Sequence, residues 1–313
     1  MGLEEGKLSV ELNGLKLKNP IITASGTFGY CDEYEEFFEV NKLGAIVTKA
    51  LTLEPRKGNS SKRIMETKSS MINSIGLENM GIYAFLEKVL PKLYSKKINF
   101  ILNIAGRTKE EYLELAKICE ENNIPAVEIN VSCPNVKSGC LEFGTDENTL
   151  YELVSEIRSL YSKTLIIKLT PNVTSIEKMA IAAQKAGADI ISAINTIKAM
   201  GLKLNYANGN FKCEKIMGGL SGCAIKPVAL RAVKAISENI NIPIIGMGGI
   251  ISLDDVFEFI AVGADAVQIG TANFTKPTIS VDLVKELENF IIKNNFKDFN
   301  ELKIKLRESV NNE

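Results

Sequence analysis

The sequence predicts a single (β/α)8 barrel, also called a TIM barrel, over residues 1–313. Eight short apolar runs alternate along the chain with eight stretches of helical length. The runs are rich in β-branched residues, which is typical of parallel strands buried on both faces. A chain of 313 residues suffices for one such barrel, so its length does not demand a second domain. A doubly wound open sheet is the main alternative, but no clear break divides the eight units into two halves.

The order of elements follows from this alternation. Thr108, Thr174 and Ser252 each precede an acidic first turn, which is the pattern of a helix N-cap. The sequences at 186–189 and 262–265, Ala-Gly-Ala-Asp and Val-Gly-Ala-Asp, predict a repeated connection from helix to strand. Strands are expected at residues 21–24, 45–48, 100–102, 126–129, 165–167, 190–193, 243–245 and 266–269. Helices are expected at about 32–40, 80–96, 108–122, 146–161, 174–186, 225–239, 252–262 and 280–292.

Three segments stand outside the alternation. Residues 8–17 alternate around Asn13-Gly14, which predicts a β-hairpin, and we expect this hairpin to cover the N-terminal mouth of the barrel. Two long inserts, at about 50–79 and 197–224, are rich in Gly, Ser, Asn and Lys. Because both follow strands, we expect them to form long loops over the C-terminal face, and long loops in compact domains usually carry function.

The composition argues against several classes of protein. The chain is 45% hydrophobic and 24% charged, as is usual for globular proteins, and its net charge of −1 argues against a nucleic-acid partner. Apolar runs stay well short of the roughly 20 residues of a membrane span. The acidic residues 1–5 lack the apolar core of a signal peptide. A cytoplasmic location without membrane contacts is therefore expected.

Metal chemistry is not expected in this chain. The sequence contains no histidine, and its six cysteines form no C-x-x-C pair. A zinc site would need thiolates or carboxylates alone, and their spacing suggests none. An iron–sulfur cluster bound by this chain is equally unsupported, so reduced thiols are the simplest interpretation.

A thiol follows the fourth expected strand, in the sequence Asn-Val-Ser-Cys-Pro-Asn at 130–135. Cys133 lies there between two amides, on a turn stiffened by Pro134. Free cysteine is often only a small buried hydrophobe. Imidazole is absent, however, and barrel enzymes build their active sites beyond strand ends, so we interpret Cys133 as a general base or nucleophile.

The residues expected at the strand ends are amides, amines, hydroxyls and glycines, without a carboxylate. Such a ring suits a planar, anionic ligand better than a glycosidase or a metal-dependent hydrolase. Gly248-Gly249 and Gly270-Thr271 follow strands seven and eight, where barrels commonly bind phosphate, although tight turns alone would also use glycine. Lys49 and Lys168 also end strands. A lysine there can face solvent, form a Schiff base or stabilise an anionic ring.

Longer motifs resemble the dihydroorotate dehydrogenase family, and most closely the catalytic subunits of its class 1B. These motifs cover nearly the whole chain, in family order, at 19–29, 73–79, 130–137, 218–222, 225–227 and 246–250. The resemblance implies an α/β barrel that binds one FMN and oxidises dihydroorotate to orotate in pyrimidine biosynthesis. Among the class 1 and class 2 enzymes, class 2 carries an N-terminal membrane segment and uses serine as its base, so the sequence fits class 1.

Matching positions imply the residues of the site. Cys133 matches the family's base, which would remove the C5 proton of dihydroorotate while a hydride leaves C6 for N5 of FMN. Lys168 would stabilise charge on the flavin, and Lys49 would lie between flavin and substrate carboxylate. Contacts to FMN are implied for Ser25, Lys49, Ala50, Asn103, Asn130, Lys168, Ile194, Gly222, Gly248, Gly249, Gly270 and Thr271. Contacts to dihydroorotate or orotate are implied for Lys49, Asn73, Ser74, Ile75, Gly76, Leu77, Asn130, Asn135, Asn195 and Thr196.

The resemblance to class 1B also implies a partner. In such enzymes a homodimer of catalytic subunits joins a second subunit in a heterotetramer, and that subunit passes electrons through a [2Fe–2S] cluster and FAD to NAD⁺. Three alternatives stay open: a class 1A homodimer that uses fumarate, another FMN-dependent barrel oxidoreductase, and a Schiff-base aldolase using Lys168. Cys31, Cys140 and Cys223 stand where the family has glycine, glycine and proline, and segment 202–215 also departs from its pattern.

Overall fold

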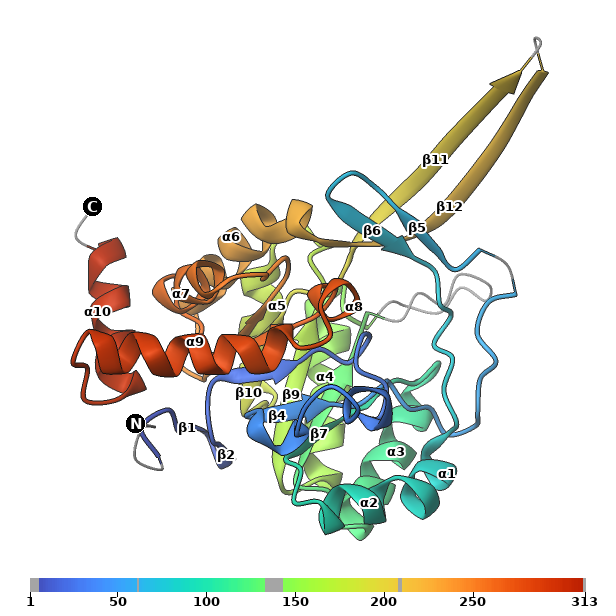
Figure 1. Cartoon of the computed structure of the whole chain (residues 1–313). Coiled ribbons are helices and arrows are strands. Elements are labelled where there is room, and N and C mark those ends of the chain that lie inside the picture. The colour runs from blue at the N-terminus through green and yellow to red at the C-terminus, as the bar shows by residue number, and fades with distance from the viewer. Residues whose placement is uncertain (1–5, 61, 133–142, 208–209, 312–313) are drawn as a thin grey trace.

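The computed structural model describes residues 6–60, 62–132, 143–207 and 210–311. It confirms the predicted barrel: eight parallel strands close in the order β10-β13-β14-β3-β4-β7-β8-β9, with helices packed around them (Figure 1). The barrel strands are β3 (Ile21–Thr23), β4 (Ala45–Val47), β7 (Phe100–Ile104), β8 (Ala126–Asn130), β9 (Thr164–Leu169), β10 (Ile190–Ala193), β13 (Ile244–Met247) and β14 (Ala266–Ile269).

Six of the expected helices are present close to their predicted bounds. Thr108 caps the first of them by accepting the backbone N–H of Glu111, and Ser252 forms a full capping box with Asp255. For the helix expected after Thr174, the N-cap is Ser175 instead. These helices are α3 (Lys109–Glu121), α4 (Glu147–Leu160), α5 (Ile176–Lys185), α6 (Lys226–Ser237), α7 (Leu253–Ala261) and α9 (Ile279–Lys293).

The prediction of a helix at 32–40 was wrong. Two short 3-10 turns stand there, η1 (Asp32–Tyr34) and η2 (Val40–Lys42). The Tyr34 ring stacks on Phe28 at 3.9 Å and its hydroxyl donates to the Thr27 carbonyl, which holds the segment in a turn. Cys31, where the family resemblance leads us to expect glycine, has a φ of +83°, in the region that favours glycine.

Three other helical features differ from expectation. The stretch 80–96 forms two helices, α1 (Ile82–Lys88) and α2 (Leu90–Ser95), because Pro91 cannot supply the N–H that a continuous helix would need. Two further helices had no predicted counterpart, α8 (Ala272–Thr275) and α10 (Phe299–Asn311).

The repeated Gly-Ala-Asp connection is confirmed, and its aspartates explain it. Asp189 Oδ2 accepts the backbone N–H of Leu165 at the start of β9 and bonds to Arg158, each at 2.8 Å. Asp265 makes the same two kinds of contact, with the first residue of β13 and with an arginine of α10. Each aspartate therefore joins one strand to its neighbour across the barrel wall.

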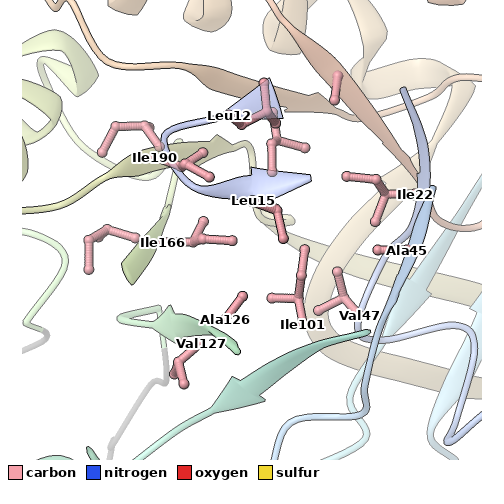
Figure 2. Close-up of a cluster of buried hydrophobic side chains, with 14 of the residues drawn as sticks. Leu12, Leu15, Ile22, Ala45, Val47, Ile101, Ala126, Val127, Ile166 and Ile190 are labelled. Carbon is pink, nitrogen blue, oxygen red and sulfur yellow. The ribbon is translucent and has the colours of Figure 1, made fainter. Parts of the chain in front are cut away.

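The N-terminal hairpin closes the N-terminal mouth of the barrel, as predicted. It consists of β1 (Val10–Leu12) and β2 (Leu15–Leu17). Figure 2 shows Leu12 and Leu15 among side chains from the first halves of the barrel strands, including Ile22, Ala45 and Ile101. Asn13 at the turn donates to the carbonyl of Asp189, which fixes the hairpin against the wall.

The inserts lie over the C-terminal face, as predicted, but they are not simply loops. Parts of both form a four-stranded antiparallel sheet, β11-β12-β6-β5, from β5 (Ile64–Glu66), β6 (Ser70–Asn73), β11 (Ile197–Ala207) and β12 (Asn210–Gly222). Gly218 permits the pairing of β12 with β6, because a Cβ there would lie 2.0 Å from the Asn73 carbonyl oxygen. The β11–β12 hairpin, which holds the divergent segment 202–215, projects away from the barrel (Figure 1) and exposes Leu202, Leu204 and Tyr206.

We predict that Leu12→Ala lowers the free energy of unfolding by about 2–5 kcal/mol, because it leaves a cavity where the hairpin seals the barrel. Lys16→Ala, at an exposed position of the same hairpin, is the control and should cost under about 0.5 kcal/mol. Denaturant unfolding of both variants measures the difference, and equal stabilities would show that the hairpin does not seal the core.

Candidate active site

A cavity of about 1600 Å³ lies between the carboxyl ends of the barrel strands and the sheet formed by the inserts. Its volume exceeds the roughly 300–1,000 Å³ of typical ligand pockets, so two ligands could occupy it together. The position agrees with the C-terminal site of (β/α)8-barrel enzymes. Predicted site residues that line it are Ser25, Lys49, Ala50, Asn73, Ser74, Ile75, Gly76, Leu77, Asn130, Lys168, Ile194, Asn195, Thr196, Gly222, Gly248, Gly249, Gly270 and Thr271.

Three predicted residues are not among those lining residues. Cys133 and Asn135 lie outside the described residues, although Val131 and Ser132, just before them, line the cavity. Asn103 lies deeper in the barrel and is fully buried. Its Nδ2 donates to Glu128 Oε1 at 2.6 Å, and no hydrogen-bond partner of its Oδ1 is found within the described part of the chain.

The predicted asparagines are fixed by one another and by the backbone. Asn195 Nδ2 donates to Asn130 Oδ1 at 3.1 Å, and Asn195 Oδ1 accepts the N–H of Thr196 at 2.8 Å. Asn73 Nδ2 donates to the Gly219 carbonyl at 3.1 Å, across the pairing of β6 with β12. These amides come from the barrel and from the insert sheet, so the two layers build the site jointly.

The two strand-end lysines have different surroundings. Lys168 is only 5% exposed, which excludes a solvent-facing role. Its Nζ lies 3.4 Å from Ser25 Oγ and 3.6 Å from Glu128 Oε1. The Lys49 side chain is 33% exposed and lies 4.0 Å from the nearest Glu78 oxygen. Lys49 therefore presents a weakly compensated positive charge to the cavity.

A buried polar cluster, not predicted from the sequence, lies beneath the cavity. Glu128 on β8 accepts hydrogen bonds from Asn103, Ser192 and Gln268 and lies beside Lys168. The available signal was a charged residue inside the short apolar run 126–129, since ionised side chains are almost never fully buried unless they are paired. Ser192 and Gln268 offered a similar signal, because each is a polar residue inside an otherwise apolar strand, β10 and β14 respectively.

Two of the glycines predicted to bind phosphate, Gly248 and Gly249, lie where neighbouring segments pack closely against the backbone. Gly248 and Gly249 have φ values of +133° and +77°, and a Cβ at Gly249 would lie 2.9 Å from the Gly222 carbonyl oxygen. A Cβ at Gly270 would meet only Ala24, at 3.6 Å. The turns after β13 and β14 and the start of α6 thus expose backbone to one side of the cavity, which suits an anionic group.

Lys226, at the start of α6, forms ion pairs with two carboxylates of α7 beside these turns. Lys226 Nζ lies 2.5 Å from Asp255 Oδ1 and 2.8 Å from Glu258 Oε2, and Asp255 also accepts the backbone N–H groups of Ile251 and Ser252. Burial by itself would raise the pKa of Asp255, but the hydrogen bonds from Lys226 and the backbone hold it below its usual value. The hydrogen bonds to Asp255 and Glu258 in turn raise the pKa of Lys226.

The residues present fit a flavin nucleotide. Gln268 lines the cavity, and its Oε1 is a buried acceptor for which the described residues supply no partner, so a ligand N–H could complete it. The buried Lys168 and the open backbone at Gly270 add a cation and room for a phosphate. In the described part of the chain, no three cysteine, aspartate or glutamate side chains come together as metal ligands.

The barrel, its cavity and the polar groups that converge there define a (β/α)8-barrel enzyme with its site at the carboxyl ends of the strands. Sequence comparison then identifies the family. The family model described as dihydroorotate dehydrogenase matches residues 7–291. The chain belongs to the dihydroorotate dehydrogenase family, as its motifs predict.

Similar proteins from three bacteria carry the name dihydroorotate dehydrogenase B (NAD(+)), catalytic subunit. The protein of Thermoanaerobacter pseudethanolicus is 46% identical over 295 residues, which are 94% of this chain and 97% of that protein. The Geotalea daltonii protein is 48% identical over 296 residues, which are 94% of this chain and 96% of that protein. The Bacteroides thetaiotaomicron protein is 42% identical over 296 residues, which are 94% of this chain and 97% of that protein. Across the described ranges, no helix is long and apolar enough to cross a membrane.

We predict that Asp255→Asn destabilises the protein by about 1–3 kcal/mol at neutral pH, because it weakens the cap of α7 and the pair with Lys226. A carboxyl with a lowered folded pKa contributes stability above its unfolded pKa of about 4 and loses it as the pH falls through the folded value. The advantage of the wild type should therefore be constant above about pH 5 and shrink below about pH 4. Thermal unfolding across this range measures it, with the exposed Asp254→Asn as control. A pH-independent difference would contradict the assignment.

Proposed function

We propose that this chain is the FMN-binding catalytic subunit of a class 1B dihydroorotate dehydrogenase, which oxidises dihydroorotate to orotate in pyrimidine biosynthesis in the cytoplasm. One observation carries the proposal: relatives bearing that subunit's name align with 94% of the chain. Support comes from the single cavity that gathers nearly every predicted site residue of the described chain.

FMN, when bound, accepts the hydride that leaves C6 of dihydroorotate. The glycines Gly222, Gly248, Gly249 and Gly270, with Thr271, are the residues that would hold its phosphate. Thr271 is kept in place by a hydrogen bond of 2.8 Å to Ser221. The ring system would be held by Ser25, Lys49, Ala50, Asn103, Asn130, Lys168 and Ile194.

Dihydroorotate is an anionic cyclic ureide, and the second part of the cavity suits that chemistry. Lys49 would attract its carboxylate, since the lysine is only weakly neutralised by Glu78. The amides of Asn73, Asn130 and Asn195 offer both donors and acceptors for the ring. Backbone of Ser74, Ile75, Gly76 and Leu77 would complete the pocket, together with Thr196 and Asn135. Holding the ring in one orientation would align the C5 and C6 hydrogens for removal.

Cys133 would be the base that takes the proton from C5. None of the four described cysteines lines the cavity, and burial raises the pKa of both Cys31 and Cys119 to about 12. Those two thiols would therefore stay protonated at neutral pH. Ser132, the residue before Cys133 in the sequence, lines the cavity, and this supports the assignment of Cys133 as the base.

We predict that Cys133→Ala still binds FMN but reduces it with dihydroorotate at least about 10²-fold more slowly, because the C5 proton has lost its acceptor. Anaerobic stopped-flow bleaching of the flavin absorbance measures the rate. Cys213→Ala, at an exposed position on β12, is the control and should bleach at the wild-type rate.

Three results would count against these assignments. Full-speed bleaching in Cys133→Ala would remove Cys133 as the base. A yellow wild-type protein that dihydroorotate does not bleach would favour a different FMN-dependent barrel oxidoreductase. A colourless protein would favour the Schiff-base aldolase.

The partner would be a subunit that carries FAD and a [2Fe–2S] cluster, joined to a homodimer of this chain in a heterotetramer. The name of the relatives, a catalytic subunit linked to NAD(+), supports a separate electron-transfer subunit. We predict that the isolated chain is bleached by dihydroorotate but does not reduce NAD⁺, because it lacks the route to that acceptor. Co-expression with the partner should supply FAD, iron and NAD⁺ reduction. Rapid turnover of the isolated chain with fumarate would instead indicate a class 1A enzyme.

A further inference from the structure

We propose that Glu128 is a positioning residue that sets the hydrogen-bonding polarity of the cavity floor. In this role it draws the amide NH₂ groups of Asn103 and Gln268 to itself, which leaves the carbonyl of Gln268 for a ligand in the cavity, and it balances the charge of Lys168. The inference rests on the proposed binding of FMN and concerns a carboxylate that the reaction itself does not use.

Glu128 has no access to solvent, yet it is surrounded by donors. Oε1 accepts from Asn103 Nδ2 at 2.6 Å and lies 3.6 Å from Lys168 Nζ. Oε2 accepts from Ser192 Oγ and from Gln268 Nε2, both at 2.8 Å. The donors come from β7, β9, β10 and β14, so one carboxylate on β8 contacts side chains from four other barrel strands. Such an array compensates the loss of hydration that a buried charge suffers.

An ionised carboxylate can only accept hydrogen bonds, and this fixes how the neighbouring amides are turned. Asn103 and Gln268 must each direct their NH₂ group at Glu128, so their carbonyl oxygens face other groups. Those two atoms, Asn103 Oδ1 and Gln268 Oε1, are buried and have no hydrogen-bond partner among the described residues. A buried acceptor without a partner costs about 1–3 kcal/mol of stability. A ligand that donates a hydrogen bond to such an acceptor would recover part of this cost.

Gln268 and Lys168 both line the cavity, so this arrangement reaches the ligand. The floor offers the Gln268 carbonyl as an acceptor beside the Lys168 ammonium as a donor. This pair is complementary to a ring edge on which N–H and carbonyl groups alternate. The flavin ring has such an imide edge. If Glu128 were an amide, it could donate as well as accept, and the two neighbouring amides would lose their fixed orientation.

The test compares FMN affinity among variants by fluorescence titration of the apoprotein. Glu128→Gln should weaken FMN binding at least tenfold, and Gln268→Met by about tenfold. The double variant should bind no more weakly than Glu128→Gln alone, because both changes remove the same carbonyl contact. Ser192→Ala, which removes a different donor from the same carboxylate, should change the affinity less than threefold.

A spectroscopic measurement separates positioning from a loss of folding. With ¹⁵N-labelled FMN, the ring N–H resonance should be hydrogen-bonded in the wild type and should shift toward its solvent value in Glu128→Gln and Gln268→Met. If Glu128→Gln does not fold, the Gln268→Met comparison decides, because its side chain leaves the other contacts of Glu128 in place.

Unchanged affinity and an unchanged N–H resonance in Gln268→Met would overturn the inference, as would multiplicative losses in the double variant. Either result would leave the proposed function standing, since the wild type would still bind FMN and be bleached by dihydroorotate. A wild-type protein with no affinity for FMN would overturn both.

Discussion

A negative charge without access to water stands at the centre of this barrel, and much of the site depends on how it is compensated. Moving a carboxylate from water into a protein interior costs several kcal/mol unless hydrogen bonds and an opposite charge replace its hydration. Glu128 receives both from side chains on four other strands. Because each donor must reach the same two oxygen atoms, the strands that carry them can pair in few registers. The same contacts hold Lys168 and Asn103 under the cavity.

The two ends of the barrel differ in what they contribute: one closes the hydrophobic core, and the other holds the candidate site. At the N-terminal mouth the β1–β2 hairpin fills the opening with leucine side chains, so that end is apolar and closed. At the C-terminal mouth the covering sheet of β5, β6, β11 and β12 leaves a large cavity lined by both apolar and polar side chains. The covering layer fits closely only because it carries glycine where it meets the barrel. A Cβ at Gly219, for example, would lie 2.0 Å from Thr196 Oγ1.

Sequence periodicity predicted the barrel well because its strands are short, apolar and separated by capped amphipathic helices. It failed where the structure depends on contacts between distant residues. The region around Tyr34 has helix-forming composition, but stacking on Phe28 holds it in 3-10 turns. The inserts have loop-like composition, and only the pairing of β6 with β12, nearly 150 residues later in the chain, makes them strands. Most residues predicted from motifs line the cavity, whereas Glu128 was not predicted because its contacts come from strands scattered over the whole barrel.

The two lysines at the strand ends, equivalent in the sequence, differ in what their charge can do. Lys168 is buried 3.6 Å from Glu128, so much of its charge is balanced within the protein. Lys49 is partly exposed, and the carboxylate of Glu78 is drawn away from it by a hydrogen bond of 2.6 Å from Arg63. Of the two lysines, Lys49 therefore keeps the charge that is available to attract an anion, and its partial exposure makes that charge cheap to solvate. The deeper lysine can hold its position without competing for that anion, because its own charge is already balanced.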